Sequence, residues 1–216
     1  MGFRINYEVK GHMAFLSHLE MMRMWQRALL RSKLPIAWSQ GFNPRPKLSL
    51  GPAKGVGIEG FGEYLDMEFT TALDGDELMK TLNGVLPLEV RVLNLRELPR
   101  GAKLLEAIIN EAVYKINFQQ GLPLDIQEKI TEFLAQETVP YLRHSPKKDK
   151  ELDLRSFVYD LEIKDKALLI SVKTGPKGSM RPEELLTVLG YWDIISDIKI
   201  QRLGLYIREA NRHSNP

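Results

Sequence analysis

Arginines recur at every fourth position in one segment of the chain, at Arg23, Arg27 and Arg31. Residues four apart lie on one face of an α-helix, so this spacing gathers three positive charges there. The like charges disfavour the helix by about 0.2–0.5 kcal/mol per pair, and no acidic residue is interleaved to offset them. Because guanidinium groups match phosphate oxygens in a bidentate manner, the pattern favours a ridge that faces phosphate. The alternative is a solvated face whose arginines pair with acidic residues of 55–98.

Residues 40–47 (QGFNPRPK) form a loop with an unusual composition. Gly41 permits a sharp turn, and each proline fixes its own φ and pushes the residue before it toward an extended conformation. We therefore expect a stiff loop, which would lose little conformational freedom when a ligand binds. Arg45 and Lys47 stand two residues apart on this loop, so it would extend the basic face of the helix.

Phe42 in this loop has two interpretations. It could stack on a nucleic-acid base, or it could fill the core beneath the turn, and the second role is the more typical one for a single aromatic residue. Whichever holds, the loop and the helix form one candidate surface. The residues predicted to bind nucleic acid or a protein partner are Arg23, Arg27, Arg31, Phe42, Asn43, Arg45 and Lys47.

The charge of the chain is unevenly distributed. The 216 residues carry a net charge of only +2. Residues 1–54 contain nine Lys and Arg against two Asp and Glu, a net charge of +7, whereas residues 55–98 contain three against nine, a net charge of −6. Because the placement of charge bears on partners more than its total does, the N-terminal quarter is the part of the chain that favours an anionic partner.

His18 is the single candidate for catalytic chemistry. It stands at the first position of the expected helix, where it could act as general acid or base in a metal-independent cleavage of RNA. A local packing or hydrogen-bonding role is the simpler interpretation, since none of the four histidines has a second histidine at the spacing of metal ligands.

A glycine-rich turn at 175–183 (GPKGSMRPE) precedes a later helix and offers Lys177, Ser179 and Arg181 to an anion. Its spacing does not match a P-loop, and a plain tight turn is the simpler interpretation. Asp66 and Glu68 share a strand face without further ligands, so no metal site is expected. Cysteine is absent, which excludes thiolate and iron–sulfur chemistry in this chain, and no cofactor is expected.

The composition, 44% hydrophobic and 27% charged, is that of an ordinary globular protein. The N-terminal residues lack the apolar region of a signal peptide, and no apolar run approaches the roughly 18 residues that a membrane helix needs. We therefore expect a cytoplasmic protein that makes no membrane contact.

Hydrophobic periodicity predicts the elements that must position these residues. A capping box of Ser17 and Glu20 opens the arginine-bearing helix, which is expected to end near residue 32 and to turn Leu19, Met22 and Trp25 inward. In the first half, strands are expected at 3–9, 47–57, 63–69 and 88–97, with helices at 18–32 and 76–83. In the second half, strands are expected at 111–118, 139–143, 157–163, 167–174 and 198–207. Helices are expected to begin at 125, where Asp125 and Glu128 have the spacing of a capping box, and at 181.

Both halves have the order strand, helix, strand, strand, helix, strand. This order predicts an α+β fold with two ferredoxin-like (βαββαβ) plaits in tandem. The first plait would span 1–98 and carry the basic helix and loop, and a linker would span 99–107. The second plait would span 108–208, with a flexible polar loop at 144–153, and residues 209–216 would form a frayed tail.

Several motifs resemble the radical-SAM-linked uncharacterised domain family. They are residues 15–50, which begin FLSHLE and contain QGFNPRPK, then GEYLDMEF at 62–69, DLR at 153–155 and GSMRPEELL at 178–186. The resemblance extends from about residue 3 to residue 205 and implies a bacterial protein that works beside a radical SAM enzyme. That enzyme would be encoded separately, because this chain lacks a cluster-binding CxxxCxxC motif, and family members often lie near genes for ribonuclease G and ribosomal proteins. The resemblance assigns no catalytic residue.

Three functions follow from these patterns. The favoured one is a non-enzymatic RNA-binding adaptor for the radical SAM enzyme, in the maturation of rRNA or tRNA. The second is a docking module that binds the same enzyme without touching RNA. The third is a metal-independent endoribonuclease that uses His18, since the order of elements is similar to that of the RNA nucleases that process CRISPR repeats. No particular oligomeric state is implied.

Overall fold

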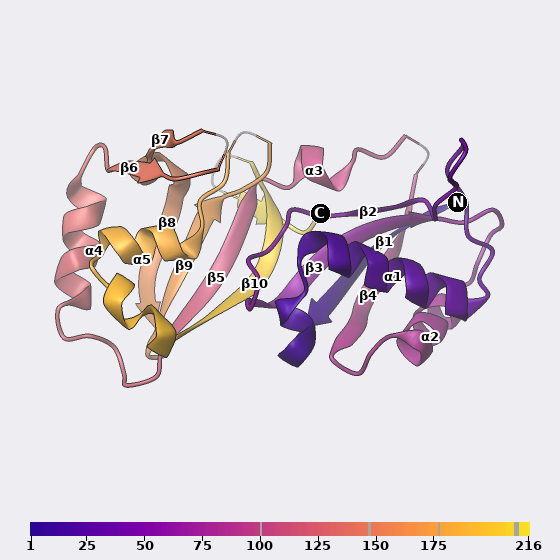
Figure 1. Ribbon diagram of the computed structural model, residues 1–216, viewed down its shortest axis with the longest axis horizontal. Coiled ribbons are helices and arrows are strands. Elements are labelled where there is room, and N and C mark those ends of the chain that lie inside the picture. The colour runs from indigo at the N-terminus through magenta and orange to yellow at the C-terminus, as the bar shows by residue number, and fades with distance from the viewer. Residues whose placement is uncertain (100, 147, 177, 210–211) are drawn as a thin grey trace. The chain divides into compact units, whose positions relative to one another are not determined.

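The computed structural model describes residues 1–99, 101–146, 148–176, 178–209 and 212–216. It is a mixed α+β structure with two compact units (Figure 1), the first comprising Met1–Ile109 with Gly204–Pro216 and the second Asn110–Leu203. The C-terminal residues therefore belong to the first unit, whereas the order of elements predicts that residues up to 208 complete the second half. Strand β10 (Ile198–Glu209) contributes residues to both units.

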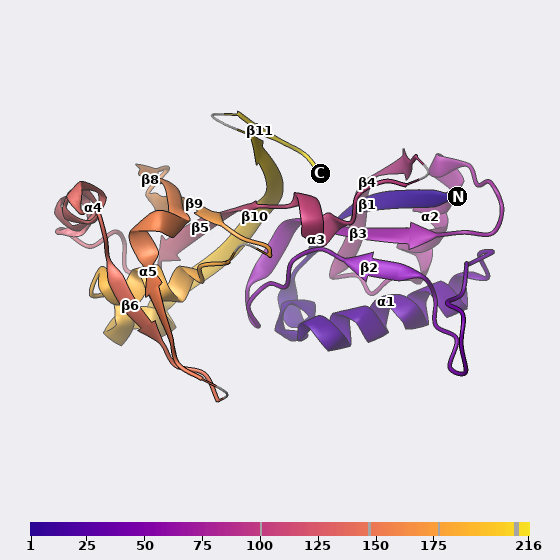
Figure 2. The same cartoon turned by 90° about the horizontal axis from the view of Figure 1, so that it is seen from above.

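The sheet of the first unit is built on β1 (Gly2–Val9). This strand lies between β3 (Glu59–Glu68) and β4 (Val90–Leu98) and is antiparallel to both. β2 (Leu48–Leu50) pairs antiparallel with β3, and β10 is also hydrogen-bonded to β3. Figure 2 shows β4, β1, β3 and β2 side by side. The extended segment expected at 47–57 is therefore a strand of three residues followed by irregular chain.

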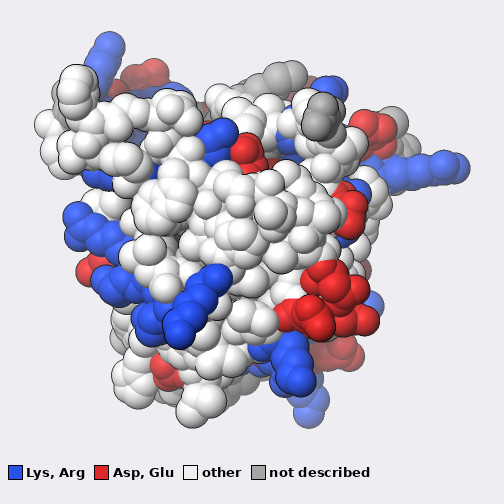
Figure 3. All heavy atoms as spheres, turned by 90° about the vertical axis from the view of Figure 1, so that its right-hand side faces the viewer, with Lys and Arg blue, Asp and Glu red and all other residues white. Residues whose placement is uncertain are grey.

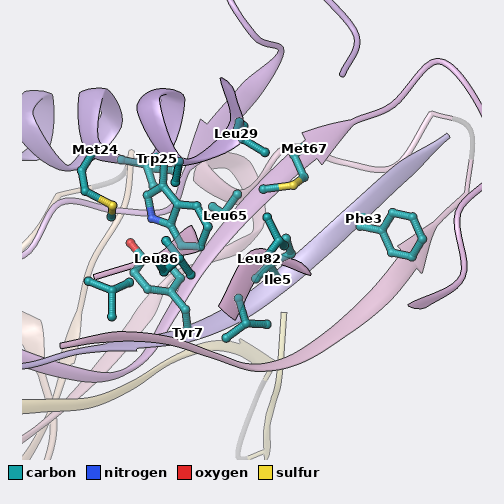
Figure 4. Close-up of a cluster of buried hydrophobic side chains, with 14 of the residues drawn as sticks. Phe3, Ile5, Tyr7, Met24, Trp25, Leu29, Leu65, Met67, Leu82 and Leu86 are labelled. Atoms are coloured by element: carbon teal, nitrogen blue, oxygen red, sulfur yellow. The ribbon is translucent and has the colours of Figure 1, made fainter. Parts of the chain in front are cut away.

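Two helices, α1 (His18–Ser32) and α2 (Gly75–Val85), pack against the core face of this sheet. The predicted bounds and capping box of α1 are confirmed, since the backbone N–H of Ser17 donates to the Glu20 carboxylate at 2.8 Å and the N–H of Glu20 reaches Ser17 Oγ at 3.4 Å. Trp25 is fully buried, and its ring meets that of Tyr7 edge-on (Figure 4).

Of the residues predicted to turn inward on α1, Trp25 is buried, Met22 is partly buried and Leu19 is exposed. Leu19 is 55% exposed, because it lies on the side of the helix opposite to the buried residues. The buried residues of α1 are Met21, Met24, Trp25, Ala28 and Leu29.

A buried arginine of β1 forms an ion pair within the sheet and a hydrogen bond to the chain that follows β4. Arg4 is 3% exposed, and its guanidinium donates to both carboxylate oxygens of Asp66 at 2.8 and 2.7 Å. The same guanidinium donates to the carbonyl oxygen of Lys103 at 3.0 Å, just before the short helix α3 (Leu105–Ile108). Asp66 therefore neutralises a buried arginine, which explains its place in the sheet without a metal.

The strands of the second unit lie in the order β10, β5 (Glu111–Phe118), β9 (Ala167–Lys173) and β8 (Val158–Lys164). The predicted hairpin of β8 and β9 is confirmed. Its turn residues Asp165 and Lys166 have φ values of 50° and 57°, as a type I′ turn requires. Two helices belong to this unit, α4 (Ile126–Ala135) and α5 (Pro182–Val188).

Three expectations about the second half and the tail are wrong. Part of the polar run at 144–153 forms β7 (Lys150–Asp153), which pairs with β6 (Pro140–Arg143) in a separate two-stranded sheet. Asp125 does not cap α4, because its carboxylate accepts a hydrogen bond from the Tyr191 hydroxyl at 2.8 Å. Within the tail that was expected to be frayed, residues 212–214 form β11 (Arg212–Ser214), which pairs with β10.

Short 3-10 helices complete the elements and span Gly11–Phe15, Leu154–Phe157 and Trp192–Asp197. Among the described residues, no helix is both long and apolar enough to cross a membrane.

Candidate nucleic-acid interface

The three arginines of α1 are exposed, but they do not all face the same way. Each step of four residues turns the helix by about 40°, so the side chains fan out around its outer surface. Arg31 lies on the flank toward α2, where its guanidinium donates to the carbonyl oxygen of Val85 at 2.7 Å. Val85 ends α2, so this arginine stabilises the negative end of a helix dipole as well as adding surface charge.

Arg23 and Arg27 remain available to a partner. Within the described ranges, neither guanidinium forms an ion pair or a hydrogen bond, so the alternative, in which these arginines pair with acidic residues of 55–98, is not seen there. Hydrogen bonds from Ser17 hold the pKa of the Glu20 carboxyl below its ordinary value, and Arg23 contributes a smaller electrostatic part of that shift. The outer face of α1 thus presents two arginines without a fixed partner.

The QGFNPRPK loop is the tip of a small hairpin. Ser39 makes both hydrogen bonds that close it: its N–H donates to the carbonyl oxygen of Arg45 at 2.8 Å, and its Oγ accepts from the N–H of Arg45 at 2.9 Å. One step further, the N–H of Lys47 donates to the carbonyl oxygen of Ala37 at 2.8 Å. The expected stiffness therefore has a second source besides the prolines, which is pairing with residues 37–39.

Phe42 does not fill the core beneath the turn. Its side chain is fully exposed, at 106% of the reference area, and the neighbouring Gly41 has a φ of 125° and open space around its Cβ position. Asn43 is exposed as well. The interpretation that Phe42 fills the core beneath the turn is therefore wrong. The tip of the paired hairpin projects into solvent and carries the ring with it.

The two cations of the loop differ in their surroundings. Lys47 Nζ lies 3.1 Å from a carboxylate oxygen of Glu68, which offsets its charge. Arg45 makes only backbone hydrogen bonds in the described parts of the chain, so its guanidinium is open. Both side chains line a groove of about 1130 Å³ that also touches Gln26 of α1 and Glu97 of β4.

The charges of the face drawn in Figure 3 are unevenly distributed. A group of Lys and Arg atoms lies at its lower left and a group of Asp and Glu atoms at its lower right, with uncharged surface between them and further Lys and Arg atoms beyond the acidic group. Along the chain, the net charge is +7 for residues 1–54 and −6 for residues 55–98. An anionic partner would therefore meet α1 and the hairpin more favourably than the opposite side.

His18 lies at a different hollow from the loop cations. This hollow has room for about one water molecule, with a volume of about 20 Å³, and is also lined by Lys54, Glu63 and Tyr64. Lys54 Nζ donates to the carbonyl oxygen of Ala14 at 2.6 Å, and burial raises the pKa of the Tyr64 hydroxyl. The role of His18 in RNA cleavage stays a prediction, and the groove that holds Arg45 does not include it.

The second candidate anion site is filled by the protein itself. Arg143 makes a bidentate ion pair with Glu184, at 2.5 and 2.7 Å, and donates to the carbonyl oxygen of Ser179 at 2.7 Å. The N–H of Arg181 donates to the same carboxylate at 2.9 Å, so Glu184 takes the place expected for a bound anion. Arg181 keeps its side chain exposed, and Lys177 lies outside the described residues.

Asp153 of the DLR motif also has a structural role, because its carboxylate accepts hydrogen bonds from the backbone N–H groups of Val139 and Arg155. No group of three or more metal-binding side chains occurs among the residues that the structure describes.

Two features of the interface were missed from the sequence. One is Ser39, which pairs with Arg45 in a hairpin that the local sequence pattern does not predict. The other is the apolar component of the surface, since Leu19, Leu30 and Trp38 are exposed near the arginines. A signal for the interface was nevertheless present, because residues 21–58 contain seven Lys and Arg and no Asp or Glu.

The geometry defines a class of protein, a mixed α+β chain that carries an exposed basic helix and a stiff hairpin on its first unit. The chain belongs to DUF2344, a family described as uncharacterized protein conserved in bacteria, which matches residues 3–182. No curated protein matches the chain.

Two solved structures are similar in part. One is the crystal structure of a Cbf5–Nop10–Gar1 complex, with a TM-score of 0.44, 12% identity and coverage of 93% of this chain and 47% of that one. The other is an H/ACA RNP bound to a substrate RNA containing 2′-deoxyuridine, with a TM-score of 0.41, 12% identity and coverage of 93% and 46%. This chain spans about half the length of those chains.

Proposed function

We propose that the first unit binds RNA through Arg23, Arg27 and Arg45, as an accessory protein of a separately encoded radical SAM enzyme in rRNA or tRNA maturation. The observation that carries the proposal is the stretch 21–58, which has seven Lys and Arg and no acidic residue. Internal interactions occupy Arg31 and Lys47, whereas the guanidinium groups of Arg23, Arg27 and Arg45 have no partner among the residues that the structure describes. Unpaired arginines on a stiff scaffold are suited to phosphate oxygens, since little ordering is needed before they bind.

The scaffold that holds these residues supports the predicted fold. In the first unit the strands lie in the order β4, β1, β3, β2, with α1 and α2 as the two crossovers. In the second unit the order β10, β5, β9, β8 has the same arrangement. We propose that each unit is a ferredoxin-like plait, and that the first one presents the interface.

Two triple variants of equal charge change test the RNA proposal. Arg23, Arg27 and Arg45 are changed to Ala in one variant, and Lys80, Arg91 and Arg96, which are the only cations of residues 55–98, are changed to Ala in the control. Fluorescence anisotropy with a structured RNA at low salt should show weaker binding by the first variant and near wild-type binding by the control. Absence of RNA binding by the wild-type protein at low salt would refute the proposal.

A second function is favoured by a different observation. Leu19 and Leu30 are 55% and 56% exposed on the outer side of α1, and apolar side chains of this size favour a protein partner. The same helix would then dock on the radical SAM enzyme without RNA. Co-purification of the two proteins that resists ribonuclease and is abolished in the Leu19→Ser and Leu30→Ser double variant would support docking. Loss of co-purification on ribonuclease treatment would contradict it.

A further inference from the structure

We infer that the hairpin tip recognises an unpaired base, so that the RNA bound by the first unit is single-stranded where it meets the tip. This inference rests on the proposed RNA binding and names its substrate class. It starts from Phe42, which is fully exposed and therefore contributes nothing to the core. Aromatic side chains ordinarily stabilise a protein through the large apolar area that they bury, and a fully exposed ring contributes no such stabilisation.

The surroundings of Phe42 leave its ring accessible. Gln40, Asn43 and Pro44 are exposed beside it, and a Cβ built on Gly41 meets no atom within 4 Å. The exposed residues 40–44 include no charged side chain. A flat base can therefore approach the ring without displacing another part of the described hairpin.

The base of the hairpin holds the ring in place. Ser39 and Arg45 exchange two hydrogen bonds, of 2.8 and 2.9 Å, and Trp38 bridges to Pro46 immediately below them. A loop closed in this way has less freedom to lose on binding than an open loop of the same length. Such preorganisation favours an aromatic residue that acts as a stacking platform.

Arg45 is positioned to bind a phosphate of the nucleotide whose base stacks on Phe42. It stands three residues after Phe42, its guanidinium has no partner among the described residues, and it lines the groove of about 1130 Å³. A nucleotide whose base stacks on Phe42 could place a phosphate near this guanidinium. In a regular duplex the bases are stacked on each other and their faces are covered, so stacking on Phe42 requires an unpaired nucleotide.

The test compares single-stranded and duplex RNA of the same sequence, roughly 12 nucleotides long to match the sites of single-strand-binding proteins. The single strand carries one 2-aminopurine, whose fluorescence falls on stacking. Affinities are measured for the wild-type protein and for the variants Phe42→Ala, Phe42→Leu and Phe42→Trp. Leu88→Ala is the matched control, because Leu88 is also fully exposed, at 104%, but lies between α2 and β4.

The expected result has three parts. Wild-type protein binds the single strand more tightly than the duplex and quenches the 2-aminopurine. Phe42→Ala and Phe42→Leu lose roughly tenfold or more in affinity for the single strand, since a base stacked on an aromatic ring contributes that much, whereas Phe42→Trp retains both affinity and quenching. Leu88→Ala behaves as wild type. Phe42→Leu separates stacking from simple apolar packing, because it keeps apolar volume and removes the ring.

Other outcomes overturn the inference in distinguishable ways. If RNA binds but the Phe42 variants bind it as wild type does, the inference fails and the proposed RNA binding stands. If Phe42→Ala weakens duplex and single strand equally, the tip does not select unpaired bases. If Phe42→Ala abolishes only a ribonuclease-resistant protein complex, the tip belongs to a protein interface. If the wild-type protein binds no RNA, the proposed function fails first.

Discussion

Two turns of this chain look alike in sequence and differ in structure. Residues 40–47 and 175–183 each combine glycine, proline and basic residues, and the second turn leads directly into α5. At the second turn, Arg143 and Glu184 form a largely buried ion pair, and the carboxylate also accepts from the backbone of Arg181. At the first turn, Arg45 has no acidic partner among the described residues. A basic turn is available to an outside anion only where the protein has not already supplied one of its own.

This comparison predicts that the arginines of the two turns contribute to different properties. The arginine of the filled turn should stabilise the fold and have no part in RNA binding. The arginines of the open surface, Arg23, Arg27 and Arg45, should bind RNA and contribute little to the stability of the fold. Loss of stability should therefore be largest for a variant of the filled turn and smallest for a variant of the open surface.

Removing Arg143 should give the largest loss of stability. Glu184 is 6% exposed on its side chain, so Arg143→Ala leaves a buried carboxylate without its partner, which costs about 3–5 kcal/mol when a buried pair is broken. Urea unfolding followed by circular dichroism measures the loss. Arg181→Ala is the matched control, because its side chain is exposed, and its expected change is within about 0.5 kcal/mol. Equal effects of the two variants would remove the distinction between the turns.

Removing the cap of α1 should give an intermediate loss. Ser17→Ala takes away the side-chain oxygen that accepts from the N–H of Glu20, and such N-cap changes cost about 1 kcal/mol. Unfolding in urea would measure it, with Ser196→Ala at an exposed position as the comparison. A loss as small as that of Ser196→Ala would mean that the capping box does not stabilise the basic helix.

The same capping box predicts a pH dependence. Hydrogen bonds from Ser17 lower the folded-state pKa of Glu20, so the ionised carboxylate contributes stability above its unfolded pKa. That contribution should disappear as the pH falls through the folded pKa, which lies below the ordinary value of 4.5. Unfolding measured against pH should therefore show a smaller acid-induced loss for Glu20→Gln than for wild type. An identical pH profile for both proteins would contradict this.

Removing an arginine from the open surface should change stability least. Arg27 stands between two like charges on α1, so Arg27→Ala should leave the free energy of unfolding unchanged or raise it by about 0.2–0.5 kcal/mol for each repulsive pair removed. The same change should weaken RNA binding in an anisotropy titration. If Arg27→Ala lowers the stability and leaves the affinity for RNA unchanged, Arg27 stabilises the fold and does not bind RNA.

Much of the fold could be predicted from local sequence signals. The helix at 18–32 follows from Ser17, Glu20 and the apolar spacing, and the hairpin of β8 and β9 follows from alternation around a short polar turn. These signals act between residues that are close in sequence. Interactions between residues close in sequence were therefore enough to predict the helix that carries Arg23, Arg27 and Arg31.

The features that could not be predicted depend on residues far apart in the sequence. The carboxylate of Glu184 meets Arg143 across 41 positions of sequence, and β11 pairs with β10 at the end of the chain although its residues have no strand pattern. The exposure of Phe42 depends on whether the tip of the hairpin packs against the rest of the protein or projects into solvent. Local conformational preferences do not decide between these two arrangements. Spacing alone thus located the candidate interface and could not show which of its charges were open.

The most direct test of the central claim is the salt dependence of RNA binding. Each arginine–phosphate interaction that a variant removes should reduce the slope of log K against log salt by about 0.7–0.9. Changing Arg23, Arg27 and Arg45 together should therefore flatten the slope by about two units, and the charge-matched control at Lys80, Arg91 and Arg96 should keep the wild-type slope. Equal slopes for wild type and both triple variants would contradict the claim that the open arginines meet phosphate.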